Sequence, residues 1–249
     1  MSCIQLLSSC TIKEDRSPCP CLLMLDFNGT DTSAVKMAEV LVMDDGTVLS
    51  EDVVDISGVG KLHMVSVPRR PLHLKVRAGV DGTDADGILR IPLGQDCPKV
   101  YMYDSDILPE GERCDVRVRM CRNHCRLKIR IEGEDEFAFG LRLEGNVAGY
   151  DADGLPMPGE FSFRIPYDGL DNEFMAVLPR QTDASLMLHI DDGEDNVKAF
   201  ALGRYIVSGG YDWTASDLED ISVSIDFAQT ELSVTVGDWE SVYNYEVEI

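Results

Sequence analysis

The sequence has no run of 18 uncharged apolar residues, and it is poor in basic residues and in histidine. Without such a run, no segment is expected to cross a bilayer as a helix. Lys and Arg number 22 against 45 Asp and Glu, so the formal net charge of -23 repels nucleic-acid phosphates. The histidines His63, His73, His124 and His189 are far apart and have no Ser or Cys nucleophile motif beside them. We therefore expect neither nucleic-acid binding nor catalysis, and we assign no catalytic residue.

The strongest local motif is Leu7-Ser8-Ser9-Cys10. A branched aliphatic residue three positions before a cysteine, with two small residues between, is typical of bacterial lipoprotein signals, and Cys10 would then carry the lipid. Acyl chains contribute roughly 0.8 kcal/mol per buried CH₂, so several of them hold a protein on a membrane. Nine residues precede Cys10 and none is Lys or Arg, so we expect the natural start to lie upstream of Met1. The alternative is a chance L-S-S-C in a cytosolic protein.

Cysteine usage leaves two interpretations open. Once Cys3 leaves with the signal and Cys10 is lipidated, six cysteines remain: Cys19, Cys21, Cys97, Cys114, Cys121 and Cys125. An exported chain permits disulfides, but the sequence selects no pairing. Zinc is the rival, because His124 lies among three of these cysteines, but the spacing lacks the C-x₂₋₄-C pair of structural zinc sites. We predict no metal and no cofactor.

Hydrophobic residues recur with a period of two, as in β-strands, and not with the period of a helix. Examples are residues 72–76, 116–120, 127–131, 221–225 and 232–236. Asp-Gly pairs such as those in Asp44-Asp45-Gly46 and Asp151-Ala152-Asp153-Gly154 separate the runs and indicate turns, and a calcium loop at the second is the less favoured interpretation. Only residues 215–220 suggest a helical turn, capped by Thr214 or Ser216. The sequence predicts an all-β protein.

A domain boundary is expected near residues 122–125. Residues 115–121 and 126–132 could form one hairpin, which would require an even-numbered loop and would put Cys121 and Cys125 on opposite faces. Alternatively, the first run ends one domain and the second run opens the next. We favour the alternative, and predict a lipidated linker at 1–18 and two domains at 19–124 and 125–249.

An ordered set of motifs resembles the fimbrillin-associated anchor family, the minor-fimbria anchor proteins of the Bacteroides group. In the second half these motifs are Val177-Leu178-Pro179-Arg180-Gln181-Thr182-Asp183-Ala184-Ser185-Leu186, Leu202-Gly203-Arg204-Tyr205-Ile206, Gly210-Tyr211-Asp212-Trp213, Asp217-Leu218-Glu219-Asp220-Ile221 and Val236-Gly237-Asp238-Trp239. In the first half they are Cys10 with Glu14-Asp15-Arg16-Ser17-Pro18-Cys19-Pro20, and Val40-Leu41-Val42-Met43-Asp44-Asp45-Gly46. The resemblance covers nearly the whole chain after Cys10.

The resemblance implies two tandem transthyretin-like Greek-key β-sandwiches, a lipid at Cys10 in the outer membrane, and a surface-exposed place as anchor or accessory subunit of a strand-exchange (type V) fimbria. Such subunits join by β-strand addition. In polymerising relatives an arginine-specific protease removes the N-terminal strand. Here Arg16 is the only arginine before the first expected strand at 22–27, so we expect an unprocessed anchor. The alternative is an independent surface lipoprotein that binds a host or glycan ligand.

Two regions are candidates for partner binding. Basic residues gather between Arg113 and Arg130 with a single acid, Asp115, inside a strongly acidic protein. We name Arg117, Arg119, Lys128 and Arg130 as possible contacts for an acidic fimbrial subunit; the alternative is that they pair with acids on neighbouring strands. The alternating run at 243–249 is the candidate terminal strand, with Tyr245, Val247 and Ile249 as its contacts. Trp213 and Trp239 are interpreted as packing residues rather than a sugar platform.

Overall fold

The computed structural model describes residues 19–30, 35–58, 61–81, 83–84, 86–132, 140–167, 172–191, 197–226, 231–236 and 239–244. The predicted all-β fold is confirmed, because its strands form four sheets and one short helix, α1 (Leu202–Ser208), accompanies them. In the described part, no helix is long and apolar enough to cross a membrane. Cys10, Arg16, Tyr245, Val247 and Ile249 lie outside the described residues.

Two sheets enclose a first hydrophobic core, and we call this unit the first sandwich. One sheet has the order β4-β1-β8 and the other the order β3-β2-β5-β7-β9. The strands are β1 (Pro20–Asp26), β2 (Met37–Asp44), β3 (Thr47–Asp55), β4 (Leu62–Pro68), β5 (Leu72–Ala78), β7 (Tyr101–Ile107), β8 (Arg113–Arg117) and β9 (Cys121–Arg122). The β2–β3 turn contains Asp45 and Gly46, both at positive φ (45° and 78°), which Asp and Gly tolerate best.

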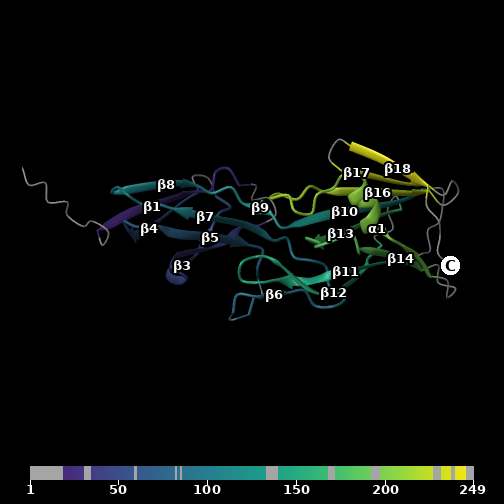
Figure 1. Cartoon of the computed structure of the whole chain (residues 1–249), viewed down its shortest axis with the longest axis horizontal. Coiled ribbons are helices and arrows are strands. Elements are labelled where there is room, and N and C mark those ends of the chain that lie inside the picture. The colour runs from purple at the N-terminus through teal and green to yellow at the C-terminus, as the bar shows by residue number, and fades with distance from the viewer. Residues whose placement is uncertain are drawn as a thin grey trace, which may run out of the picture.

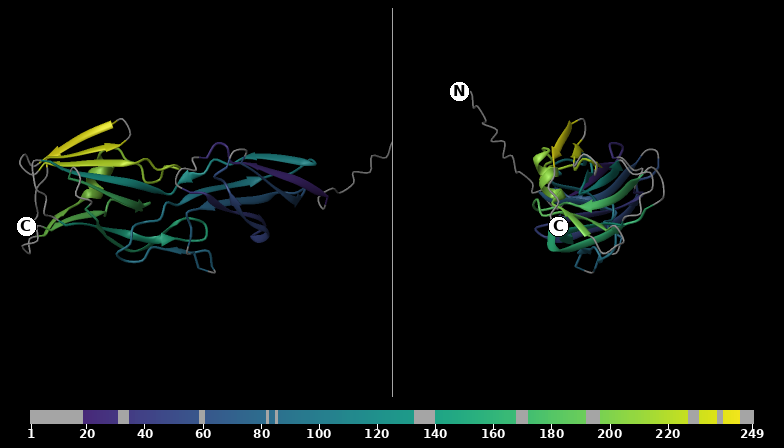
Figure 2. Two further views of the ribbon diagram at one scale, coloured as in Figure 1. Left: turned by 180° about the vertical axis from the view of Figure 1, so that it is seen from behind. Right: turned by 90° about the vertical axis from the view of Figure 1, so that its right-hand side faces the viewer.

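Two more sheets enclose a second core, and we call this unit the second sandwich. Their orders are β13-β10-β16-β17-β18 and β12-β11-β14-β15. The strands are β10 (His124–Glu132), β11 (Gly140–Tyr150), β12 (Pro156–Ile165), β13 (Glu173–Pro179), β14 (Met187–Asp191), β15 (Val197–Phe200), β16 (Ile221–Asp226), β17 (Glu231–Val236) and β18 (Trp239–Asn244). The sandwiches lie end to end along the long axis in Figure 1, and the right-hand view of Figure 2 looks along that axis.

Seven strands of each sandwich follow the same pairing plan. β1 lies between β4, antiparallel, and β8, parallel; β10 lies in the same way between β13 and β16. The opposite sheets run β3-β2-β5-β7 and β12-β11-β14-β15. The two halves therefore repeat one topology, and β17 and β18 extend the second sandwich beyond it. The possible hairpin of 115–121 with 126–132 does not form, because β8 and β10 belong to different sandwiches.

Residues 89–100 lie between β5 and β7 in the sequence but pack in the second sandwich. β6 (Leu89–Arg90) pairs with β11, and Leu89, Ile91, Cys97 and Val100 belong to the second core. The segment also borders β12 and β13, since Gly94 N donates to Ser162 O and Cys97 N donates to Val177 O. The two sandwiches are thus linked by more than one crossing of the chain, and the division at 124/125 stays a prediction.

The helical turn expected at 215–220 is wrong. That region is irregular, because Thr214 N and Oγ1 both donate to Asp212 Oδ1 and close a local turn instead of capping a helix. The helix lies earlier, at α1, which buries Leu202, Gly203 and Ile206 against the second core and lacks a side-chain cap. Its two apolar positions four residues apart are too short a pattern to predict a helix.

Candidate functional site

The basic residues between Arg113 and Arg130 divide into paired and unpaired groups. Lys128 Nζ lies 2.8 Å from Glu173 Oε1, and the guanidinium groups of Arg122 and Arg126 share Asp220. Burial opposes ionisation of Asp220, but the hydrogen bonds from Arg126 and the positive charges of Arg122 and Arg126 hold its pKa below the usual value. Among the described residues, Arg117, Arg119 and Arg130 form no ion pair. Of the four predicted partner contacts, Lys128 is therefore already paired with an acid, whereas the three arginines keep a positive charge that a partner could bind.

Those four residues do not form one patch. Arg117 ends β8, and the stems of Arg117 and Arg119 lie beside Gly29, where a Cβ would be 3.7 Å from Arg119 Cγ and 4.0 Å from Arg117 Cδ. Lys128 and Arg130 lie on β10, in the second sandwich, among the side chains that leave the core. The structure thus places one pair on each sandwich, with Arg119 close to the junction between them.

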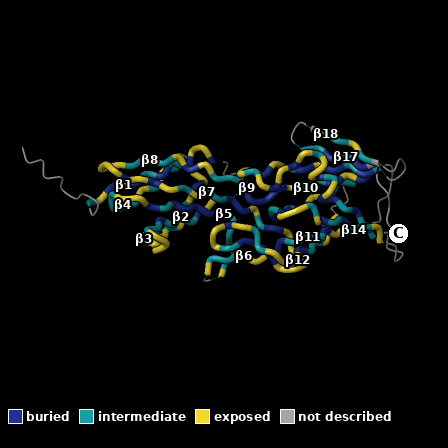
Figure 3. Tube along the Cα trace, viewed as in Figure 1, coloured by how far each residue is buried: buried dark blue, intermediate teal, exposed yellow. Residues whose placement is uncertain are grey.

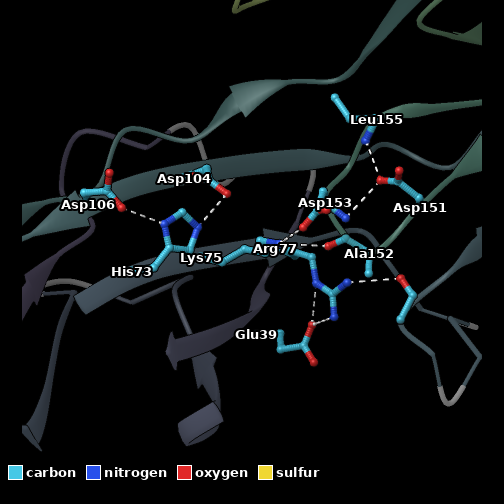
Figure 4. Close-up of polar contacts among 11 residues, drawn as sticks. Glu39, His73, Lys75, Arg77, Asp104, Asp106, Asp151, Ala152, Asp153 and Leu155 are labelled. Atoms are coloured by element: carbon cyan, nitrogen blue, oxygen red, sulfur yellow. Dashed lines mark hydrogen bonds and ion pairs between the residues drawn. The ribbon is translucent and has the colours of Figure 1, made fainter. Parts of the chain in front are cut away.

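Three polar side chains of β5, those of His73, Lys75 and Arg77, point out of the first core, and Lys75 reaches the second sandwich (Figure 4). Lys75 is 5% exposed, and its Nζ lies 2.6 Å from Asp153 Oδ1 and 3.1 Å from Ala152 O. Arg77 is 6% exposed and binds Glu39 Oε2 and Gly87 O. A buried charge is costly unless paired, so these contacts fix the loops that cover β5. The hydrogen bond from Lys75 lowers the pKa of Asp153.

His73 continues this row and lies between two carboxylates. Its ring nitrogens are 3.0 Å from Asp106 Oδ1 and 3.1 Å from Asp104 Oδ2 (Figure 4). The hydrogen bond to Asp106 raises the pKa of His73, and Asp104 adds to the effect. Asp151 closes the facing turn, since its Oδ1 accepts hydrogen bonds from Asp153 N and Leu155 N, each at 2.9 Å. Asp151 and Asp153 thus serve a turn and an ion pair, and no cluster of three metal-ligating side chains occurs in the described ranges.

Arg180 is the central residue of the junction. Its Nη1 donates to the carbonyl oxygens of Trp213 and Ala215, and its Nε donates to Asn123 Oδ1. Asn123 Nδ2 in turn donates to Gly154 O at 2.7 Å. All of these acceptors are neutral, and the described part of the chain gives Arg180 no carboxylate partner. A fixed guanidinium therefore keeps its full positive charge beside the first sandwich.

A cleft of about 770 Å³ lies at this junction. The first sandwich and its link to the second contribute Tyr103, Asp104 and Arg119, and the second sandwich contributes residues 153–156, 180–182 and 213–216. Trp213 belongs to the floor and is 6% exposed, so it packs as expected and offers no open ring face. Arg180 and Lys75 were not recognisable as site residues, because their role depends on partners far away in the sequence.

The six cysteines of the described part are free thiols. Cys97 and Cys125 are buried in the second core, and burial raises the pKa of Cys125 to about 12. Burial also raises the pKa values of Cys21, Cys114 and Cys121. A high thiol pKa disfavours the nucleophilic thiolate, so these side chains are suited to packing and not to reactivity.

Tandem β-sandwiches that repeat one topology and share a salt-bridged junction define this molecule as an elongated β-sandwich scaffold. Residues 103–245 match the family of fimbrillin-A associated anchor proteins Mfa1 and Mfa2. The chain belongs to this family, which is one of fimbrial structural proteins and not of enzymes. The family resemblance found in the sequence is therefore confirmed.

Solved structures show the same fold. The fimbrial anchor protein Mfa2 of Porphyromonas gingivalis has a TM-score of 0.63 at 13% identity, over 91% of this chain and 100% of that one. A Bacteroides thetaiotaomicron protein described as a candidate polysaccharide-binding protein gives 0.69 at 12%, over 91% and 98%. The tip fimbrial protein Mfa3 of P. gingivalis gives 0.57 at 12%, over 91% and 100%. No curated protein matches the sequence.

Proposed function

We propose that this protein is the lipid-anchored base or accessory subunit of a strand-exchange fimbria, attached to the outer membrane through Cys10. Membership in the fimbrial anchor family supports a place in a fimbria, and the Leu7-Ser8-Ser9-Cys10 motif supports the lipid. The protein joins major or minor fimbrial subunits by β-strand addition and exposes its sandwiches on the cell surface. Its role is to tether the fimbria and to limit its growth.

The observation that carries the proposal is the difference between β8 and β16, which occupy equivalent places in the two sandwiches. β17 pairs with the outer edge of β16, and β18 pairs with β17. No strand of the described residues pairs with the outer edge of β8. Cys114 and Val116 of β8 face the first core but stay half-buried, whereas Ile221, Val223 and Ile225 of β16 are at most 2% exposed. An added strand would supply the missing backbone partners and apolar cover at β8.

The first strand supports a terminal position in the fimbria. β1 lies between β4 and β8, and Cys21, Leu23 and Leu25 are fully buried. Each such side chain contributes roughly 1.5–3 kcal/mol, so β1 stays in place in an unprocessed chain. An incoming strand can therefore pair with the outer edge of β8 but cannot take the place of β1. Arg16 precedes β1, so cleavage there removes the lipid and leaves the sandwich complete.

The candidate for a donated strand on this chain is the C-terminal run at 243–249, of which Tyr243 and Asn244 already pair with Leu232 and Glu231 of β17. β18 is the last strand of its sheet and belongs to the β17–β18 extension that the first sandwich lacks. This run would add to a sheet of a neighbouring subunit by the same edge pairing through which a neighbour's strand adds to β8.

The test is the intact mass of the subunit in a gently detergent-extracted fimbrial fraction from its native cells. We expect a mature protein that begins at a triacylated Cys10 and purifies with the fimbria. A chain that begins at Ser17 would identify a processed, polymerising subunit instead. A lipidated protein absent from fimbriae would favour the independent ligand-binding lipoprotein.

A further inference from the structure

The cleft between the sandwiches has an excess of available positive charge in a protein of net charge -23. Its two acids, Asp104 and Asp153, are already paired with His73 and Lys75. Its two arginines, Arg119 and Arg180, form no ion pair with any residue that the structure describes. An unpaired guanidinium is the preferred protein partner of a carboxylate. Arg119 can offer two parallel hydrogen bonds, whereas Arg180 has only Nη2 left to donate.

Arg180 is also preorganised for binding. Its Nε and Nη1 are held by Asn123 and by the carbonyl oxygens of Trp213 and Ala215, while no hydrogen bond from Nη2 to a described residue is present. A side chain that is already fixed loses little conformational entropy when a ligand arrives. Arg119 is exposed at the rim, so it can turn toward a ligand at the same position.

The remaining lining indicates what carries the carboxylate. Asp104 and Asp153 keep exposed carboxylate oxygens (48% and 75% side-chain exposure) that can accept hydroxyl groups. Tyr103 and Leu155 add apolar surface, and Leu155 is 62% exposed. A ligand that suits all of these groups has one carboxylate, several hydroxyl donors and an apolar ring face. An acidic peptide fits less well, because its further carboxylates would meet Asp104 and Asp153.

We infer that the cleft binds an acidic saccharide, with the sugar carboxylate on Arg119 and Arg180 and neighbouring hydroxyl groups on Asp104 and Asp153. A volume of about 770 Å³ lies in the range of small-ligand sites and suits a few sugar rings. The inference does not depend on the proposed fimbrial role, because it uses only the junction of the two sandwiches.

The test is calorimetric titration of the full chain with a hexuronic-acid trisaccharide and a sialyl trisaccharide, each beside a neutral trisaccharide of equal size. We expect at least one acidic sugar to bind and its neutral counterpart to bind roughly tenfold more weakly or not at all. Arg119→Ala should weaken binding by a similar factor. The matched control is Arg117→Ala, which removes an equally unpaired arginine two residues away that does not line the cleft.

Both variants should keep the melting temperature of the natural protein, since both side chains are exposed. The inference is overturned if neither acidic sugar binds at about 10 mM, a concentration that detects the weakest specific sites. It is also overturned if neutral sugars bind equally well, or if Arg117→Ala matches Arg119→Ala. Tighter binding of a glutamate-rich peptide than of either sugar would replace it with a peptide-docking site.

Discussion

Each of the two sandwiches contains seven strands paired in the same order, but the sandwiches differ in how the edges of their sheets are covered. In the second sandwich, β17 and β18 cover the edge of β16, and residues 89–100 lie against β12 and β13. In the first sandwich, β8 ends its sheet and its core-facing residues stay half-buried. Figure 3 shows the alternating half-buried and exposed positions along β8. One topology thus yields a sandwich with a covered edge or one with an open edge, depending on chain segments added outside the seven shared strand positions.

The largest effect should come from removing the part of the second core that the segment 89–100 supplies. Leu89 and Ile91 are 4% and 5% exposed, so replacing both by Ala should lower the free energy of unfolding by about 4 kcal/mol or more. Urea unfolding gives the total, and hydrogen exchange locates the loss, which we expect in the second sandwich. Leu93→Ala is the control, because Leu93 lies in the same segment and is 60% exposed. Loss of protection in the first sandwich alone would contradict the assignment.

Val116 and Val223 occupy equivalent positions in the two sandwiches. Val116 pairs with Leu25 across β1 and β8, as Val223 pairs with Ile129 across β10 and β16. Val223→Ala should cost about 2 kcal/mol of stability, and Val116→Ala should cost less than about 1 kcal/mol in the isolated protein. Chemical denaturation measures both. Equal costs would mean that the core under β8 is as well covered as the core under β16.

Strand positions in both sandwiches could be read from the sequence, whereas the features that distinguish the sandwiches could not. Alternation predicts β5, β10, β16 and β17, and Asp45-Gly46 predicts the β2–β3 turn, because these patterns are local. The segment 89–100 contains Pro92, Gly94 and Pro98 and has no period, so nothing in it indicates packing against β11. Its place is fixed by contacts with residues far along the chain.

The contacts at the junction of the two sandwiches could not be predicted from the sequence either, because they also join residues far apart in the chain. Lys75 and Arg77 occupy the polar positions of an alternating strand, which is the pattern of a solvated face. Lys75 is covered by the turn at 151–154, whose contacts lie 77 and 78 residues further along the chain, and Arg77 is held by Glu39 and Gly87. The excess of basic residues between Arg113 and Arg130 was visible, but their acidic partners Glu173 and Asp220 were not.

A smaller effect is expected at the ion pair that joins the sandwiches. Asp153→Asn should cost about 1 kcal/mol, because it leaves the buried Lys75 ammonium without its carboxylate. Lys75→Met is the matched control and should stay within about 0.5 kcal/mol of the natural protein, since it removes the charge together with its need for a partner. A larger loss for Lys75→Met than for Asp153→Asn would contradict this account.

The same pair gives a pH dependence of defined sign. The pKa of Asp153 is lower in the folded state than its usual value, so its contribution is present above the usual pKa and is lost as the pH falls through the folded pKa. Denaturation of the natural protein between about pH 5 and pH 2 should show this loss, and Lys75→Met should lack it.

The smallest effect should come from His73. Its pKa is raised in the folded state, so its contribution is complete below the usual pKa of about 6.5 and is lost as the pH rises through the raised value. His73→Gln should change stability by less than about 0.5 kcal/mol, and only on the acidic side of neutrality, because the ring and Asp104 are partly exposed and Asp106 is almost fully exposed. Titration of the ring by NMR checks the direction of the shift. A pKa below the usual value would exclude the paired geometry.

The measurement that tests the difference between the sandwiches most directly is hydrogen exchange of β8 in the isolated protein and in the assembled fimbria. β16 serves as an internal reference, because β10 and β17 flank it in the isolated chain. We expect the amides of Arg113, Asp115 and Arg117, which alternate with the amides bonded to β1, to exchange quickly in isolation and to become protected in the fimbria, while β16 is protected in both. Unchanged exchange of β8 on assembly would contradict strand addition at this edge.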